Sequence, residues 1–272
     1  MSKTTWDPKL AEVYRKMPPP GPPSKSELKV YERFVKDINK KNKQARVLIL
    51  GSTPGLRDLC VKYKSKYTCV DYHSDNYKIS KKAMKYRQKD KYGSLVVGDW
   101  RKIKLPNTFD LVLGDIASGV TPYKDWDKLW FNISESMKED ALLVHRTWMR
   151  QKGHFKNLES YLKNYHSKRR KRMSAFTSFT IPFVHYFYNE KQGMILFSQN
   201  LPKLKKFVNK NLMSKKDYDE FCYFFGRYKI PNYFPFKPKY EKKLKQFFEI
   251  KDISKGRDWF KDYALIYILT KK

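Results

Sequence analysis

The chain has 272 residues, of which 40% are apolar and 16% aromatic, enough to form a core and to exclude wholesale disorder. No apolar run approaches the roughly 20 residues that span a bilayer, and the N-terminus lacks the apolar stretch of a signal peptide. The three cysteines have no metal-type spacing, so we expect free thiols, no bound metal, no membrane contact and a cytoplasmic location.

The net charge of +32 is the strongest compositional signal. A surface this basic attracts polyanions, nucleic acids first among them. The basic excess is denser outside residues 45–150 than within them. Lysine is abundant together with Tyr, Phe and Asn, so a compositional bias of the whole genome is an alternative explanation of the charge.

Residues 1–45 predict an N-terminal arm followed by a helix. Trp6 and Tyr14 flank a short helix-like piece, and the proline-rich residues 17–23 predict an extended polyproline segment. Ser24 or Ser26 is placed to cap the next helix. This arm is either a linker with a packing helix or a lid that folds over a ligand pocket.

Residues 46–149 alternate between strand-like and helix-like segments. Strands are predicted over residues 46–50, 67–71, 94–99, 109–115 and 141–145. Helices are predicted over residues 56–63, 74–87 and 126–137. Such alternation with short connections predicts a parallel, doubly wound sheet.

Functional residue types follow several of these strands. Gly51 begins a tight turn between the first strand and a helix N-terminus, an arrangement that suits an anion or a nucleotide. Asp71, Asp99 and Asp115 each end a later strand. Because ligands of such sheets bind at the carboxyl ends of the strands, we expect these residues to share one site.

Residues 150–240 interrupt the alternation with a basic stretch at 163–172 and aromatic runs at 176–188 and 221–225. Basic residues among aromatic ones bind single-stranded nucleic acid by charge and stacking. A solvated face over an ordinary aromatic core is the interpretation that we favour. Residues 241–272 predict two antiparallel strands that complete the sheet.

With these segments in place, the sequence resembles class I S-adenosylmethionine-dependent methyltransferases. The resemblance covers residues 46–149 and 247–269, and Val47 to Gly55 looks like the first motif of that family. It implies a Rossmann-like methyltransferase fold, which is a doubly wound, seven-stranded, mostly parallel sheet with an antiparallel last strand. The helical and aromatic residues 150–240 would then be an insertion for the substrate.

The resemblance also implies a binding site for S-adenosyl-L-methionine. Asp71 matches the acid that holds the ribose hydroxyls, Asp99 and Trp100 match the pair beside the adenine, and Asp115 matches the residue facing the methyl donor and the substrate. The candidate cofactor-binding residues are Gly51, Ser52, Thr53, Pro54, Asp71, Tyr72, Asp99, Trp100 and Asp115.

The first motif departs from the usual family pattern at two positions. Ile49 stands where an acid is usual, and Thr53 stands where a second glycine is usual. The chain looks similar to a subset with a Gly-x-Thr-Pro form, which often carries an N-terminal segment with Trp, Tyr and three prolines, and this favours the lid. Arg57 or another group is then a candidate for holding the methionine end.

His145 and Asp115 are the candidate catalytic bases, although a histidine at a strand end is more often structural. The fourth strand is not followed by the Asn- or Asp-Pro-Pro-Tyr motif of amino-directed DNA methylases. The leading hypothesis is methyl transfer to an unidentified acceptor, either a small molecule or RNA. The alternatives are a nucleic-acid-binding protein that keeps the fold and, third, a dinucleotide oxidoreductase, which the turn at Thr53 and Pro54 fits poorly.

Overall fold

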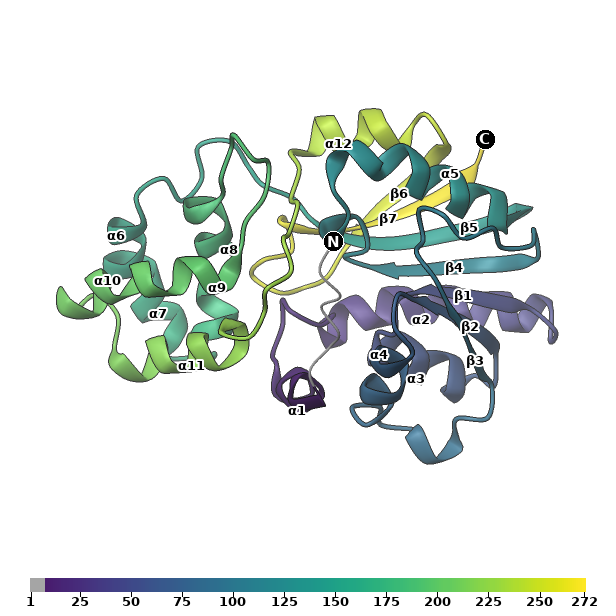
Figure 1. Cartoon of the computed structure of the whole chain (residues 1–272), viewed down its shortest axis with the longest axis horizontal. Helices are drawn as coiled ribbons and strands as arrows, with labels where there is room; N and C mark the ends of the chain where they lie inside the picture. Colours follow the sequence, from purple (N-terminus) through teal and green to yellow (C-terminus); the bar gives the residue numbers. More distant parts are fainter. Residues whose placement is uncertain (1–7) are drawn as a thin grey trace.

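The computed structural model describes residues 8–272, so Trp6 lies outside the described residues. Its centre is a seven-stranded sheet in the order β3-β2-β1-β4-β5-β7-β6 (Figure 1). The strands are β1 Arg46–Leu50, β2 Lys66–Asp71, β3 Gly93–Val97, β4 Phe109–Asp115, β5 Met137–Trp148, β6 Phe248–Lys255 and β7 Ala264–Lys271. β7 runs antiparallel to both neighbours and the other strands are parallel, which confirms the predicted sheet.

Burial on both faces explains why the central strands read as continuous apolar runs. Val47, Leu48, Ile49 and Leu50 are all buried, and successive side chains point to opposite faces of the sheet. Val47 and Ile49 pack beneath α2 (Lys25–Lys41) and α3 (Pro54–Lys62). Leu48 and Leu50 belong to the core under α5 (Trp126–Ser136) and α12 (Lys237–Leu244) on the other face (Figure 1).

The helix α2 begins with the predicted serine cap. The Ser24 hydroxyl accepts a hydrogen bond from the Glu27 amide, and the Glu27 carboxylate accepts one from the Ser24 amide at 2.7 Å. This capping box satisfies two amide groups that the first turn leaves without partners. The prediction of a cap is therefore confirmed at Ser24.

Several predicted segments differ from the structure. The strand predicted over residues 94–99 ends at Val97, so Asp99 follows β3, and the strand predicted over residues 141–145 extends over Met137–Trp148. The helix expected over residues 74–87 ends at Lys81, because the carboxylate of Asp58 accepts hydrogen bonds from the amides of Lys85 and Tyr86 and turns the chain toward α3. The extended polyproline segment is also wrong for residues 19–22, which form a turn and bends. α1 (Pro8–Lys16) precedes this segment, and α4 (Ser74–Lys81) follows β2.

The helices of residues 150–240 gather beside the carboxyl end of the sheet (Figure 1). They are α6 Leu158–Tyr161, α7 Ser167–Arg170, α8 Ala175–Phe187, α9 Phe197–Asn200, α10 Lys205–Asn209 and α11 Lys215–Phe225. Their core is aromatic, so most rings of the predicted aromatic runs are buried in it. α8 continues through Pro182, which has no amide hydrogen to donate to the carbonyl of Ser178 four residues earlier. The Tyr161 hydroxyl donates a hydrogen bond to that carbonyl instead.

Candidate functional site

A cavity of about 620 Å³ lies at the carboxyl ends of the strands, between the sheet, the N-terminal arm and the helices of residues 150–240. All nine sequence-predicted cofactor residues line it. They are Gly51, Ser52, Thr53, Pro54, Asp71, Tyr72, Asp99, Trp100 and Asp115. The register explains this convergence, because Leu50 pairs with both Val70 and Gly114 and so brings the ends of β1, β2 and β4 to one edge.

Gly51 and Trp100 form one corner of the cavity. Gly51 has a φ of +86°, and a Cβ added there would lie 3.5 Å from the Trp100 ring. The Trp100 indole donates a hydrogen bond to the Val70 carbonyl at 2.6 Å, which fixes the orientation of the ring. Glycine thus supplies the backbone conformation, and the tryptophan supplies a flat apolar wall beside it.

Asp71 is the centre of a polar cluster in the same cavity. Its carboxylate accepts hydrogen bonds from the Ser52 hydroxyl at 2.8 Å and from the Asn76 amide at 2.6 Å. Burial raises the pKa of Asp71, and the hydrogen bonds from Asn76 and Ser52 act against that rise. The three side chains together offer donors and acceptors suited to vicinal hydroxyl groups.

Asp99 is held more tightly than the sequence suggests. Both of its carboxylate oxygens accept hydrogen bonds from the Arg101 guanidinium, and Arg101 also bonds Asp125 at 2.7 Å. Burial opposes ionisation of Asp99, but the hydrogen bonds from Arg101 outweigh it and lower the pKa. Asp99 is therefore a fixed carboxylate that shares its lone pairs with Arg101.

Asp115 is ion-paired with Arg146, a residue that the sequence analysis did not identify. The Arg146 Nε donates to the Asp115 Oδ1 at 2.7 Å, and both side chains are buried. Burial raises the pKa of Asp115, and the charge of Arg146 acts in the opposite direction. The sequence did contain a signal for this pair: an arginine stands inside the apolar part of strand β5, and a buried cation requires an acidic partner.

Arg146 also ties the N-terminal arm to the sheet. Its guanidinium donates to the carbonyls of Pro20 and Gly21 at 3.2 and 2.7 Å and to the Glu27 carboxylate at 2.9 Å. Tyr31 adds a second tie, since its hydroxyl donates to the Gly114 carbonyl and accepts from the Arg146 amide. The residues just after α1 are thereby fixed at the cavity.

The backbone beside Asp115 is strained. Ile116 has a φ of +56°, a left-handed conformation that β-branched residues rarely adopt. Its amide donates to the Arg146 carbonyl at 2.9 Å, and its carbonyl accepts from Gly119. Ile116 lines the cavity, and local strain of this kind is concentrated at functional sites.

His145 does not line the cavity. Its side chain is fully buried against Trp130 and Tyr240, with the Nδ1 3.0 Å from the Tyr240 hydroxyl. Burial lowers the pKa of His145 to about 3, so the imidazole is neutral near pH 7. This placement favours a structural histidine, and Asp115 is the candidate base that lines the cavity.

Arg57 does not line the cavity, so its position does not support the contact with the methionine end for which it was one candidate. Its guanidinium is buried and bonds Asp90, Ser80 and the carbonyl of Tyr77. On α3 the side chain points toward β2 and α4 instead of the cavity. Ile49, where the family usually has an acid, is likewise buried in the core.

The basic residues 163–172 lie on the helical part, and several of them are engaged within the chain. The Arg169 guanidinium lies 3.8 Å from the centre of the Trp259 ring. Arg170 pairs with Asp217 and Glu220. Lys168, Lys171 and Arg172 are exposed.

No His, Cys, Asp or Glu group among residues 8–272 has the arrangement of a metal site. Within the same described range, no helix is both long and apolar enough to cross a bilayer.

Neither a protein-family model nor a curated protein matches the sequence. Solved structures do match. The PH0226 protein of Pyrococcus horikoshii has a TM-score of 0.55 at 15% identity, covering 95% of this chain and 98% of its own. An S-adenosylmethionine-dependent methyltransferase of Methanosarcina mazei has a TM-score of 0.50 at 14% identity. This match covers 86% of the present chain and 96% of the Methanosarcina chain.

A putative zinc-dependent alcohol dehydrogenase of Rhodobacter sphaeroides has a TM-score of 0.57 at 12% identity, covering 98% of this chain and 100% of its own. At such identities the matches show the fold alone. That fold is the Rossmann-like methyltransferase fold, with six strands parallel and the last antiparallel. The differing names of these matches mean that function has to be argued from the site.

Proposed function

We propose that the chain is an S-adenosylmethionine-dependent methyltransferase of class I, in the subset with a Gly-x-Thr-Pro first motif. The observation that carries the proposal is the convergence of Gly51, Asp71, Trp100 and Asp115 on one cavity. Thr53 and Pro54 support the subset, since they form the N-cap and the first residue of α3 and both line the cavity.

The residues fit the chemistry of the cofactor. Asp71 with Ser52 and Asn76 would hold the ribose hydroxyls, and the Trp100 ring would cover the adenine. Asp99 would accept from the adenine amine with lone pairs that it shares with Arg101. Ser52 and Thr53, together with amides at the start of α3, are placed to meet the amino-acid end.

When bound, S-adenosylmethionine supplies a methyl group that its positive sulfur already activates. The protein then has to align the acceptor with that methyl group and to exclude water. Asp115 is the residue that would orient the acceptor and take up its proton, because it is the acid beside the strained turn at Ile116.

Calorimetric titration with S-adenosylhomocysteine tests the proposal. We expect one site per chain and no binding of NAD under the same conditions. Binding of NAD without binding of S-adenosylhomocysteine would favour the oxidoreductase alternative. Binding of neither ligand would contradict an enzyme that uses this cofactor.

A further inference from the structure

The half of the cavity beyond the cofactor residues has aromatic walls. Its rings come from the end of β5, from α9 and α11, and from residues 228–234, and they include Trp148, Phe197, Phe224, Phe225 and Phe234. Phe197 and Phe225 stack with ring centres 4.0 Å apart, and Trp148 and Phe234 stack at 5.1 Å. This packing makes the walls rigid surfaces suited to a flat apolar ligand.

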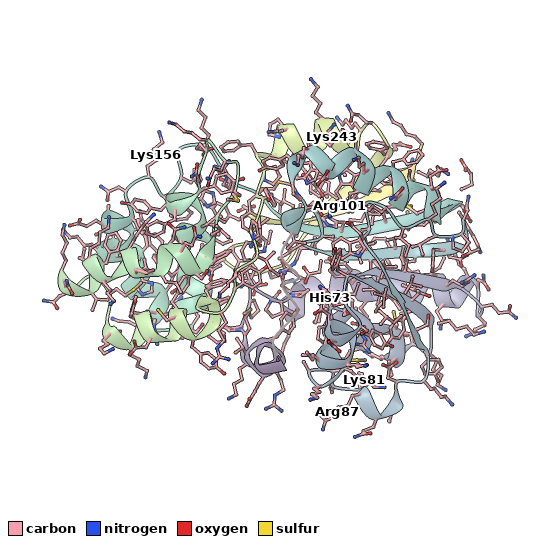
Figure 2. All side chains as sticks on the ribbon, in the orientation of Figure 1. His73, Lys81, Arg87, Arg101, Lys156 and Lys243 are labelled. Atoms are coloured by element: carbon pink, nitrogen blue, oxygen red, sulfur yellow. The ribbon has the colours of Figure 1, made fainter. Side chains whose placement is uncertain are left out.

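The cavity does not share the strong basic excess of the whole chain. Three acids line it (Asp71, Asp99 and Asp115), whereas the lysines and arginines in its lining are Arg101 and Lys229. Arg101 is bonded to Asp99 and Asp125, and Lys229 is exposed. Figure 2 shows Arg87, Lys156 and Lys243 at the outline of the molecule, away from its centre.

This distribution disfavours a nucleic acid as the acceptor. A nucleotide that is turned out of its strand into a pocket brings phosphates with it, and these require several cations near the pocket. The described residues lining the cavity provide no such cluster. Basic side chains such as Arg87, Lys156 and Lys243 lie instead at the outline of the molecule (Figure 2).

Three polar side chains line the cavity next to its aromatic walls. Asp115 lines the cavity there together with Tyr14 of α1 and Tyr228. Burial raises the pKa of Tyr14, and the nearby charge of Asp115 raises it further. Burial also raises the pKa of Tyr228 to about 12, so both hydroxyls remain protonated near pH 7.

Resting on the proposed function, we propose that the methyl acceptor is a small, uncharged compound with an aromatic ring and one hydroxyl or amino group. The ring lies between the aromatic walls, and the polar group faces Asp115. In the transfer, the bond from sulfur to the methyl carbon breaks as the bond from that carbon to the acceptor oxygen or nitrogen forms. The proton of the acceptor passes to the Asp115 carboxylate.

The experiment measures binding of phenol, indole and 2-naphthol by calorimetry in the presence of saturating S-adenosylhomocysteine. Phe224→Ala removes one wall, and we expect it to weaken binding of 2-naphthol about tenfold. Ile230→Trp fills the same half of the cavity without removing a core ring, and it should abolish that binding. Tyr223→Ala, at the exposed neighbour of Phe224 on α11, is the matched control and should bind like the wild type.

The outcomes separate the two proposals. If wild-type protein does not bind S-adenosylhomocysteine, the proposed function fails. If it binds S-adenosylhomocysteine but none of the three ring compounds, or if Phe224→Ala and Ile230→Trp leave 2-naphthol binding unchanged, only the acceptor class is overturned. Displacement of 2-naphthol by a 12-nucleotide oligouridylate would also overturn it, in favour of a nucleic-acid acceptor.

Discussion

Arg146 and Asp115 form a buried ion pair at the carboxyl ends of β4 and β5, with the Arg146 Nε 2.7 Å from the Asp115 Oδ1. Glu27 shares the same guanidinium, so a single positive charge stabilises two buried carboxyl groups. Arg146→Met leaves both carboxylates without their counter-ion and should lower the free energy of unfolding by about 3–5 kcal/mol. Urea denaturation measures this loss.

The exposed Arg172→Met is the matched control and should change the stability little. Adding Glu27→Gln to Arg146→Met removes one of the two orphaned charges. The double variant should therefore lose less stability than the two single variants together. Strict additivity would show that the two side chains do not interact.

Asp71→Asn should weaken S-adenosylhomocysteine binding by about tenfold or more, because a hydrogen bond to a charged group contributes about 1.5–3 kcal/mol. Calorimetry gives the dissociation constant. Asp75→Asn, four residues further along and exposed on α4, is the control with the same chemical change. Equal affinities of the two variants would contradict the role of Asp71.

Gly51 and Gly153 offer a matched pair of glycine substitutions. Their φ values are +86° and +85°, so alanine at either position costs about 1–2 kcal/mol of backbone strain. A Cβ at Gly153 meets nothing within 4 Å, whereas a Cβ at Gly51 points toward Trp100 in the cavity. We expect similar losses of stability but weaker cofactor binding only in Gly51→Ala, as measured by urea denaturation and calorimetry.

The lowered pKa of the buried His145 predicts that the stability of the fold depends on pH. Its pKa is about 3 in the folded chain against 6.5 for the ordinary side chain, so below pH 6.5 the unfolded chain binds a proton that the folded chain does not. Stability therefore falls as the pH decreases from 6.5 toward 3. His145→Gln should reduce this slope by up to about 1.4 kcal/mol per pH unit between pH 6 and 5, measured by urea denaturation. If the slope of stability against pH were the same in His145→Gln and the wild type, the pKa of His145 would not be lowered by folding, and the imidazole would be in contact with water.

The sheet and the cofactor half of the cavity could be predicted from the sequence because their signals are local. An apolar run that ends in Gly51 or Asp71 reports both a strand and its carboxyl end, and the parallel pairing brings these ends together. The lining of this half therefore agrees with the predicted residues.

The acceptor half could not be predicted, because no local pattern relates Phe197 or Phe224 to β4. Both reach the cavity through the packing of helices far along the chain. Arg57 shows why nearness in sequence does not place a side chain in the cavity. It stands beside the predicted loop in sequence, yet its position on α3 turns it toward Asp90.

The cavity is enclosed by the N-terminal arm, the sheet and the helices of residues 150–240, so its lining extends in sequence from Val13 to Phe234. A molecule bound there would act as a noncovalent cross-link between the arm, the sheet and the helices, and binding to the folded chain alone would raise its stability by mass action. At a ligand concentration 100 times the dissociation constant this linkage amounts to about 2.7 kcal/mol. The thermal unfolding midpoint should thus report occupancy of each half of the cavity before any methylated product has been identified.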